Sequence, residues 1–359
     1  MPQRVVLAMS GGVDSSVAAH LLKAEGYDVV GLFMRTGSHG ESEERRAKTC
    51  CSIADALDAR RVADRLEIPF FVLDFEREFG RIQDYFADEY YAGRTPNPCV
   101  MCNIWLKFGR LWEYGESVGA DFVATGHYAR IAQGPGGEPR IGRGLDRDKD
   151  QSYVLSGLSK EMLPRILFPI GGLAKAEVRA LALECNLPVH DKAESQEICF
   201  VPDDDYLGFI HRRRPDQETA GSIVDETGTV LGEHPGIEKF TIGQRRGLGF
   251  AVGEPRYVVQ IEPASKTVTV GRRESLTRPA LEAERFNWQS PAPEGPISCH
   301  AQIRARHRAV PAVAEPLEEG RVRVRFETPQ AAVAPGQVVT LYQDDMVLGG
   351  GWIDRALAE

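Results

Sequence analysis

The fold class can be inferred from residues 5–16, which are Val5-Val6-Leu7-Ala8-Met9-Ser10-Gly11-Gly12-Val13-Asp14-Ser15-Ser16. In this segment an apolar run is joined to a helical pattern through two glycines. Residues 5–9 predict a buried strand, and residues 15–24 predict a helix. Glycines permit the tight turn between them, and the first N–H groups of the helix, with the loop hydroxyl groups, suit an anion. The sequence therefore predicts a phosphate-binding loop after the first strand.

Short apolar runs and amphipathic stretches continue to alternate after this loop. We expect strands at residues 29–34, 70–75 and 122–125, and helices at residues 43–66, 79–91 and 106–118. Such alternation is typical of a parallel sheet that is covered by helices on both faces. The fold class predicted for residues 1–202 is therefore α/β, with a parallel sheet.

The second half of the chain has a different texture, with short alternating runs and many turns. Strands are expected at residues 257–261, 267–270, 321–326 and 338–342. Period-2 patterning of this kind suits a small barrel or sandwich. We expect a small central β-rich domain over residues 203–280 and a C-terminal β-barrel over residues 281–359.

Charge and hydropathy narrow the classes of protein that fit. The chain has 359 residues, with 43 Lys+Arg and 52 Asp+Glu, so its formal charge is −9. This balance disfavours binding of nucleic acid through overall charge, and any RNA contact must use local arginine clusters. Such clusters occur at residues 212–214, 245–246 and 272–273, and at the alternating positions 304, 306 and 308.

The last of these clusters has the period of a strand. On an extended strand, arginines at 304, 306 and 308 would share one face.

The chain also has no apolar run of membrane-spanning length and no signal-peptide core, so we expect a cytoplasmic location and no membrane partner.

The loop at residues 10–16 lacks the Lys-Ser/Thr ending of a Walker motif, which disfavours transfer of a γ-phosphate. Its carboxylate, Asp14, suits Mg²⁺. SGGVDS resembles the loop of the PP-loop ATP pyrophosphatases, which holds pyrophosphate while AMP passes to an oxygen atom. The resemblance implies ATP, with Mg²⁺, as the ligand, and it leaves the acceptor open.

Seven cysteines, an odd number, indicate thiol or metal chemistry rather than a disulfide framework. Cys102 precedes the helix expected at residues 106–118, whose dipole would stabilise a thiolate. Cys199 lies in the polar segment 194–200. The others apart from Cys99 are expected to be structural filler: Cys50, Cys51, Cys185 and Cys299.

Taken in order, these motifs resemble the bacterial tRNA-specific 2-thiouridylase family over nearly the whole chain. The matching motifs are SGGVDSS (10–16), LFM (32–34), TPNPCVMCN (95–103), KF (107–108), ATGHY (124–128), KDQSY (149–153), SQEICF (195–200) and FTIGQRRGL (240–248). The resemblance implies ATP-dependent thiolation of the wobble uridine, position 34 of tRNA, with release of AMP and pyrophosphate.

Residue roles follow from the same resemblance. It implies ATP contacts from Ala8, Met9, Ser10, Gly11, Gly12, Val13, Asp14, Ser15, Met34 and Gly126. It implies tRNA contacts from Asn97, Pro98, Cys99, Lys149, Asp150, Gln151, Arg304 and Ala305. It makes Cys199 the carrier of a persulfide and Cys102 its partner, and the two would end the cycle as a disulfide.

Two departures from the family pattern concern the tRNA contacts. Some members have Asp where this chain has Cys99, so that thiol is not expected to be indispensable. An Arg-Tyr pair is common near the C-terminus, whereas this chain has Arg304 followed by Ala305. The resemblance further implies tRNAs for Lys, Glu and Gln as substrates, and a sulfur-relay protein or cysteine desulfurase as the sulfur donor.

Alternatives remain for the cysteines and for the reaction. Cys99, Cys102 and Cys199 could supply three metal ligands, but zinc normally takes four. A [4Fe–4S] cluster with an open iron is the stronger metal alternative, although it is not favoured. The rival function is a PP-loop ligase that adenylates a small molecule, and a non-catalytic RNA-binding module is a third interpretation, which the acidic charge and the complete loop disfavour.

Overall fold

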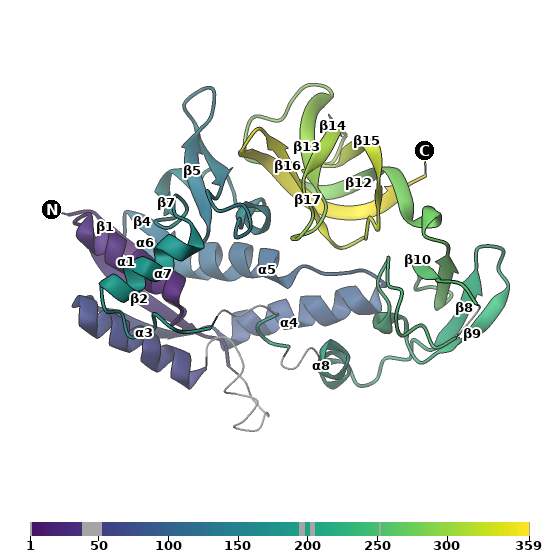
Figure 1. Ribbon diagram of the computed structural model, residues 1–359, viewed down its shortest axis with the longest axis horizontal. Helices are drawn as coiled ribbons and strands as arrows, with labels where there is room; N and C mark the ends of the chain where they lie inside the picture. The colour runs from purple at the N-terminus through teal and green to yellow at the C-terminus, as the bar shows by residue number, and fades with distance from the viewer. Residues whose placement is uncertain (1, 38–51, 194–197, 202–204, 251–252, 359) are drawn as a thin grey trace. The chain divides into compact units, whose positions relative to one another are not determined.

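The computed structural model describes residues 2–37, 52–193, 198–201, 205–250 and 253–358 (Figure 1). The chain divides into two compact units. Unit 1 comprises residues 1–82, 99–204 and 345–347, and unit 2 comprises residues 83–98, 205–344 and 348–359. Within the described ranges, no helix is both long and apolar enough to cross a membrane.

Unit 1 is built on a five-stranded parallel sheet with the order β3-β2-β1-β4-β7. Its strands are β1 (Arg4–Ala8), β2 (Asp28–Arg35), β3 (Phe70–Asp74), β4 (Phe122–Thr125) and β7 (Ile166–Leu167). The strand order reverses between β1 and β4. In open parallel sheets, ligands bind outside the carboxyl ends of the strands at such a reversal. The sheet order therefore predicts a ligand-binding site where residues 9–12 leave β1.

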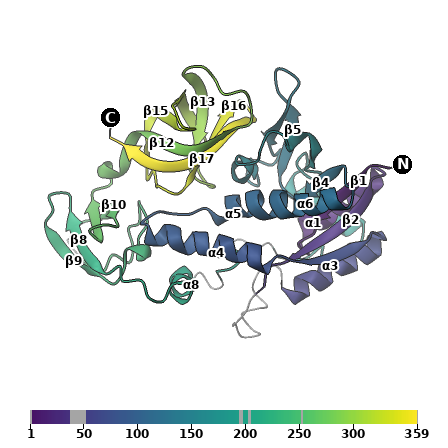
Figure 2. The same cartoon turned by 180° about the vertical axis from the view of Figure 1, so that it is seen from behind.

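Helices cover both faces of this sheet, as the alternation in the sequence predicts. Three of them share one apolar core, α1 (Val13–Ala24), α3 (Ile53–Leu66) and α7 (Lys175–Glu184). Val5 and Leu7 belong to that core, whereas the intervening Val6 lies beside α6 (Leu111–Ser117). The α/β fold class with a parallel sheet is confirmed (Figures 1 and 2).

The remaining elements of unit 1 extend this framework. They are the first part of α4 (Glu76–Tyr91), α5 (Pro98–Met101), the π-helical η1 (Cys102–Arg110), the hairpin β5 (Ala129–Gln133) and β6 (Pro139–Arg143), and the 3₁₀ turns η2 (Ser152–Leu155) and η3 (Leu163–Arg165). The helix α3 begins with a capping box, because Ser52 and Asp55 satisfy each other's amide groups. That cap fixes the start of α3 close to the loop after β1.

Unit 2 contains two β-structures with separate cores. The first is a four-stranded sheet of β8 (Gly221–Asp225), β9 (Val230–His234), β10 (Tyr257–Glu262) and β11 (Thr267–Gly271), which follows α8 (Tyr206–Arg213) and includes the 3₁₀ turn η5 (Ile237–Lys239). The second follows η6 (Glu274–Leu276). It comprises β12 (Thr277–Trp288), β13 (Ile297–Gln302), β14 (Val310–Pro316), β15 (Val322–Ala331), β16 (Val338–Gln343) and β17 (Met346–Leu357).

These last six strands close into a barrel, because β12 pairs with both β15 and β17. The expected C-terminal β-barrel is therefore confirmed. The proposed division into three domains stays a prediction, with boundaries at residues 202 and 280.

Two sequence predictions about local structure are wrong. The helix expected at residues 106–118 begins at Pro98, because proline suits the first position of a helix and the turn continues through Cys102. The strand expected across Arg304, Arg306 and Arg308 is a turn, which the Gln302 amide stabilises by donating to the carbonyl groups of Arg304 and Ala305. The three arginines are exposed but do not share a strand face.

Other expectations hold in part. The helix expected at residues 43–66 is described from Ile53 to Leu66, and its remainder lies largely outside the described residues. The hairpin of β5 and β6 and the helix α8 were not predicted.

Candidate functional site

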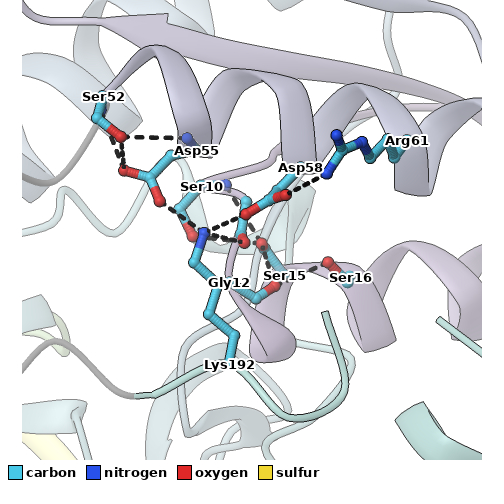
Figure 3. A network of polar contacts seen from close by, with 10 residues as sticks. Ser10, Gly12, Ser15, Ser16, Ser52, Asp55, Asp58, Arg61 and Lys192 are labelled. Atoms are coloured by element: carbon cyan, nitrogen blue, oxygen red, sulfur yellow. Dashed lines mark hydrogen bonds and ion pairs between the residues drawn. The ribbon is translucent and has the colours of Figure 1, made fainter. Parts of the chain in front are cut away.

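The loop that leaves β1 is closed by hydroxyl groups of the first turn of α1. The Ser10 amide donates to Ser15 Oγ at 3.2 Å, and the hydroxyl groups of Ser15 and Ser16 donate to the Gly12 carbonyl at 3.2 and 2.7 Å (Figure 3). Gly12 is the residue that caps α1. The expected strand-loop-helix arrangement is thus present, with the positive end of a helix dipole at the loop.

Gly11 cannot be replaced without moving α3. Its φ is +73°, in the left-handed region, and a Cβ atom there would lie 2.2 Å from the Asp55 carbonyl oxygen. Only glycine combines that conformation with such a close approach. The capped start of α3 therefore packs directly against the loop.

The ATGHY motif lies against the same loop. Ala8 of β1 pairs with Thr125 of β4, so Gly126 follows at the same edge of the sheet. A Cβ atom on Gly126 would lie 2.8 Å from the Ser15 amide nitrogen. Two motifs that are distant in sequence thus form one surface around the start of α1.

Asp14 forms an ion pair that the sequence did not predict. Lys175, the first residue of α7, contacts the two carboxylate oxygens of Asp14 at 2.7 and 2.9 Å. The Tyr128 hydroxyl also donates to Asp14, at 2.8 Å. The Lys175 ammonium group lies 5.6 Å from the centre of the Tyr128 ring. In this arrangement, the carboxylate that suits a cation is neutralised by a lysine.

A second unpredicted lysine, Lys192, contacts the loop itself. Its ammonium group donates to the Gly11 carbonyl at 3.0 Å and also pairs with Asp55 and Asp58 of α3 (Figure 3). Neither lysine belongs to a motif identified in the sequence. Lys175 is 161 residues from Asp14, and Lys192 is 181 residues from Gly11. No local pattern could have identified them, because only the tertiary fold brings them to the loop.

His127 is held as a neutral imidazole. It is buried, its Nδ1 lies 2.7 Å from Thr125 Oγ1, and its Nε2 lies 3.4 Å from the Lys107 ammonium group. Burial, reinforced by the charge of Lys107, lowers the pKa of His127 well below its usual value. The histidine therefore stays uncharged at neutral pH, and it orients the turn next to Gly126.

The other residues expected to contact the nucleotide lie at the same edge of the sheet. Met9 is buried and its amide donates to the Leu32 carbonyl at 2.8 Å. Met34, near the end of β2, is half-buried. The structure thus brings together the ten candidate positions, Ala8, Met9, Ser10, Gly11, Gly12, Val13, Asp14, Ser15, Met34 and Gly126.

The segment from Lys149 to Gln151 is organised mainly by contacts within unit 1. Asp150 accepts hydrogen bonds from Arg143, Gly144 and Ser152, at distances from 2.8 to 3.1 Å. Gln151 exchanges two hydrogen bonds with Tyr128, both of 2.9 Å. These side chains shape a turn beside the ATGHY motif, and their expected contact with tRNA stays a prediction.

The cysteine-bearing helix differs from the sequence prediction in a way that matters for reactivity. Because helix formation starts at Pro98, Cys99 lies in the first turn and Cys102 follows that turn. The effect of the helix dipole falls off beyond the first turn, so the dipole argument for Cys102 is wrong. Cys102 instead opens the π-helical stretch, a feature that often occurs at functional sites. Cys99 is exposed and Cys102 is half-buried.

Cys199 lies in a turn of unit 1. The Val201 amide donates to the Ile198 carbonyl at 2.9 Å, and the neighbouring Phe200 packs edge-on against Phe79, with ring centres 5.6 Å apart. Cys199 itself is half-buried. The turn gives the thiol a defined place next to a buried aromatic anchor.

Two other cysteines have inert surroundings. Burial raises the pKa of the Cys299 thiol to about 12. Burial, with a smaller effect of Glu184, also raises the pKa of Cys185, whose sulfur lies 3.2 Å from His20 Nε2. Both surroundings agree with a structural role, whereas Cys50 and Cys51 lie outside the described residues. Among the residues that the structure describes, no group of three or more His, Cys, Asp or Glu side chains is arranged to hold a metal ion.

In unit 2, the chain before Pro98 is anchored to the barrel. The Gln337 side-chain amide donates to the carbonyl groups of Thr95 and Pro96 at 3.0 and 3.2 Å. The Asn97 side chain that follows is buried. The TPNP segment is therefore held in place before the cysteine helix begins.

In the arginine cluster at residues 212–214, Arg213 and Arg214 form ion pairs with carboxylates of α4. Arg213 and Arg214 contact Asp84 on α4 at 2.9 and 2.8 Å, and Arg214 also pairs with Asp88 at 2.9 Å. Arg304 and Ala305, in contrast, are exposed on the turn after β13. The exposed turn is the better candidate for a contact with phosphate groups.

The fold and this loop define a class of nucleotide-binding α/β protein. Residues 3–203 match the family model described as a tRNA methyl transferase HUP domain. Residues 208–272 match a tRNA methyl transferase PRC-barrel domain, and residues 278–353 match an aminomethyltransferase beta-barrel domain.

Curated relatives narrow this class to one family. The chain is 51% identical over 359 residues to the tRNA-specific 2-thiouridylase MnmA of Geotalea uraniireducens, covering 99% of this chain and 96% of the relative. It is 46% identical to the proteins of that name from Rhodopirellula baltica and Clostridium perfringens, covering 99% of this chain and 97% and 99% of those proteins. The chain belongs to the tRNA-specific 2-thiouridylase family.

Proposed function

We propose that this protein replaces the C2 oxygen of the wobble uridine of tRNA by sulfur, and that it consumes ATP and releases AMP and pyrophosphate. The observation that carries the proposal is the closed SGGVDS loop at the strand reversal, packed against Gly126, in a chain of this family. The proposed acceptors are tRNAs for Lys, Glu and Gln, in the cytoplasm.

The loop residues fit the phosphate groups of ATP. Gly12 has no side chain to fill the space beside Ser10 Oγ, which would lie 3.4 Å from a Cβ atom at that position. The start of α1 offers N–H groups, and Ser10 is exposed there. Asp14 would hold Mg²⁺ once Lys175 turns to the phosphate groups, and Met34 and Gly126 would border the adenine.

ATP supplies an adenylyl group that converts the C2 oxygen of uridine into a good leaving group. The C2 oxygen bonds to the α-phosphorus, and pyrophosphate departs from the loop. The protein must keep water away from the activated base, so the base has to leave the anticodon stack for a closed site. Asn97, Pro98 and Cys99 would face that base, while Lys149, Asp150, Gln151, Arg304 and Ala305 would contact the rest of the tRNA.

The two half-buried cysteines would then transfer sulfur. The terminal sulfur of a Cys199 persulfide bonds to C2, and AMP leaves with the former C2 oxygen. The Cys102 thiolate next attacks Cys199 Sγ, which breaks the bond to the transferred sulfur and leaves that bond's electrons on it. The resulting Cys102–Cys199 disulfide is reopened by a cellular thiol reductant. A sulfur-relay protein or a cysteine desulfurase would reload Cys199.

The products of ATP test this proposal. Purified full-length protein with unmodified tRNA should convert ATP to AMP and pyrophosphate, and omission of tRNA should stop the release. Formation of ADP and phosphate alone would contradict the proposal. Pyrophosphate release that ignores tRNA and requires a small carboxylate would favour the rival ligase activity.

A further inference from the structure

Lys192 is placed as a clamp on the phosphate loop. Its ammonium group has three N–H donors and three acceptors, which are Gly11 O at 3.0 Å, Asp55 Oδ1 at 2.6 Å and Asp58 Oδ2 at 2.7 Å (Figure 3). Its side chain is only 29% exposed. A half-buried lysine with every donor used holds its contacts in one geometry.

The cluster around Lys192 is fixed from the side of α3. Asp55 also accepts hydrogen bonds from the Ser52 amide and hydroxyl groups, at 3.0 and 2.8 Å, as part of the helix cap. Burial opposes the charge of Lys192, but the hydrogen bonds that the lysine donates to Asp55 and Asp58 outweigh this effect and raise the pKa of the lysine. Lys192 therefore stays an ammonium ion and ties the Gly11 carbonyl to a rigid helix start.

The carbonyl that Lys192 holds belongs to the peptide that offers the Gly12 N–H. This peptide is planar and trans, so its C=O and N–H groups point in opposite directions. Glycine on both sides leaves the peptide free to rotate as a unit, unless something holds one end. When Lys192 holds the oxygen, the Gly12 N–H points away from Lys192.

We propose that Lys192 is a positioning residue that fixes the Gly11–Gly12 peptide with its N–H directed to the phosphate groups of the nucleotide. The inference rests on the proposed function, since it assigns a role at the same loop. Lys192 itself touches no reacting atom. Its effect is to keep one anion-binding donor oriented before the nucleotide arrives, which removes the cost of orienting it on binding.

The test compares two probes in full-length variants by calorimetric titration. Inorganic pyrophosphate uses the loop, whereas adenosine has no phosphate group. Lys192→Met, which keeps the length of the side chain, should weaken pyrophosphate binding about tenfold, equivalent to about 1.4 kcal/mol, and leave adenosine affinity unchanged. Lys192→Arg retains the charge and the donors and should restore most of the pyrophosphate affinity.

A matched control is available in Lys23 of α1, whose ammonium group contacts the other end of α3. It donates to the Leu66 carbonyl and pairs with Glu67 at 3.4 Å, at the opposite end of α3 from the loop. Lys23→Met should leave both affinities unchanged. Asp58→Asn keeps the contacts of Lys192 with Gly11 and Asp55, so it should weaken pyrophosphate binding less than Lys192→Met does. Asp58→Asn replaces Lys192→Met in the test if Lys192→Met fails to fold.

The outcomes separate this inference from the proposed function. Equal pyrophosphate affinity in wild type and Lys192→Met would overturn the inference, and so would a parallel loss of adenosine affinity, because that pattern marks a general structural role. If Lys192→Met does not fold, equal pyrophosphate affinity in wild type and Asp58→Asn would overturn it. Failure of the wild-type protein to bind either pyrophosphate or ATP would instead contradict the proposed function.

Discussion

Gly126→Ala should disrupt the contact between the ATGHY turn and the phosphate loop. The new Cβ atom would lie 2.8 Å from the Ser15 amide nitrogen, 2.9 Å from the Asp14 carbonyl carbon and 3.0 Å from Ser15 Cα. All three atoms are backbone, so no side-chain rotation can relieve the overlap. Reaching an ordinary contact of 3.4 Å requires the turn and the helix start to separate by about 0.6 Å.

The cost of this overlap can be estimated from overpacked cores. Forced insertion of a methyl group costs about 1–3 kcal/mol, and each kcal/mol lowers the melting temperature of a domain of this size by about 2–4 °C. We therefore expect a loss on the order of 5 °C. ATP affinity should fall by about tenfold or more, because the displaced residues include the first amides of α1.

Thermal unfolding and calorimetric titration with ATP measure both effects. Gly172→Ala is the matched control, since Gly172 is exposed in the same unit and a Cβ atom there meets nothing within 4 Å. That control should retain wild-type ATP affinity and melting temperature. Wild-type ATP affinity and stability in Gly126→Ala would refute the argument that this close approach shapes the site.

Three further predictions concern the barrel, the cysteines and the exposed turn. A hydrogen bond from Arg323 lowers the pKa of the Glu282 carboxyl group in the barrel, with a further contribution from Arg355, while burial opposes the shift. The ionised carboxylate therefore stabilises the folded protein above the unfolded pKa near 4.5, and this stabilisation is lost as pH falls through the lower folded pKa. Glu282→Gln should therefore cost about 3 kcal/mol at neutral pH and flatten the acid limb of the stability curve in urea titrations, and an unchanged limb would contradict this. Cys199→Ser should abolish thiolation but keep tRNA-dependent pyrophosphate release, whereas Cys185→Ser should keep both, and thiolation at the wild-type rate by Cys199→Ser would exclude the persulfide role. The exposed turn carries three arginines to be replaced by Ala, singly and together, because the turn does not align them: Arg304, Arg306 and Arg308. Each replacement that removes a phosphate contact should reduce the slope of log tRNA affinity against log salt concentration by roughly 0.7 to 0.9. An unchanged slope would mean that another surface binds the RNA.

The fold was predictable where local pattern and topology agree. Residues 122–125 were expected to form a strand, and β4 spans Phe122–Thr125 in a parallel sheet. The SGGVDS loop was predictable because its glycines, hydroxyl groups and carboxylate lie in consecutive residues. The arginines at 304, 306 and 308 show the limit of such reasoning, since their period-2 spacing lies on a turn that Gln302 holds with its side chain. A period of two residues over so short a stretch does not distinguish a strand from a turn.

The supporting part of the site was not predictable from one sequence. Lys175 and Lys192 act on the loop through contacts across more than a hundred residues, and neither sits in a pattern that marks it. The sequence pattern predicts the cysteine helix only from residue 106, whereas Pro98 occupies the first helical position. The late start places the positive end of the helix dipole near Cys102 instead of Cys99.

The mass of the modified nucleoside tests the proposed thiolation of tRNA. Unmodified tRNA is incubated with the purified protein, ATP and a cysteine desulfurase with cysteine, which supplies persulfide sulfur. The tRNA is then digested to nucleosides and analysed by mass spectrometry with position mapping. We expect a wobble uridine whose mass has increased by the exchange of one oxygen for one sulfur, only when ATP is present. An unchanged uridine, or one whose mass has increased by a methylene group, would contradict it.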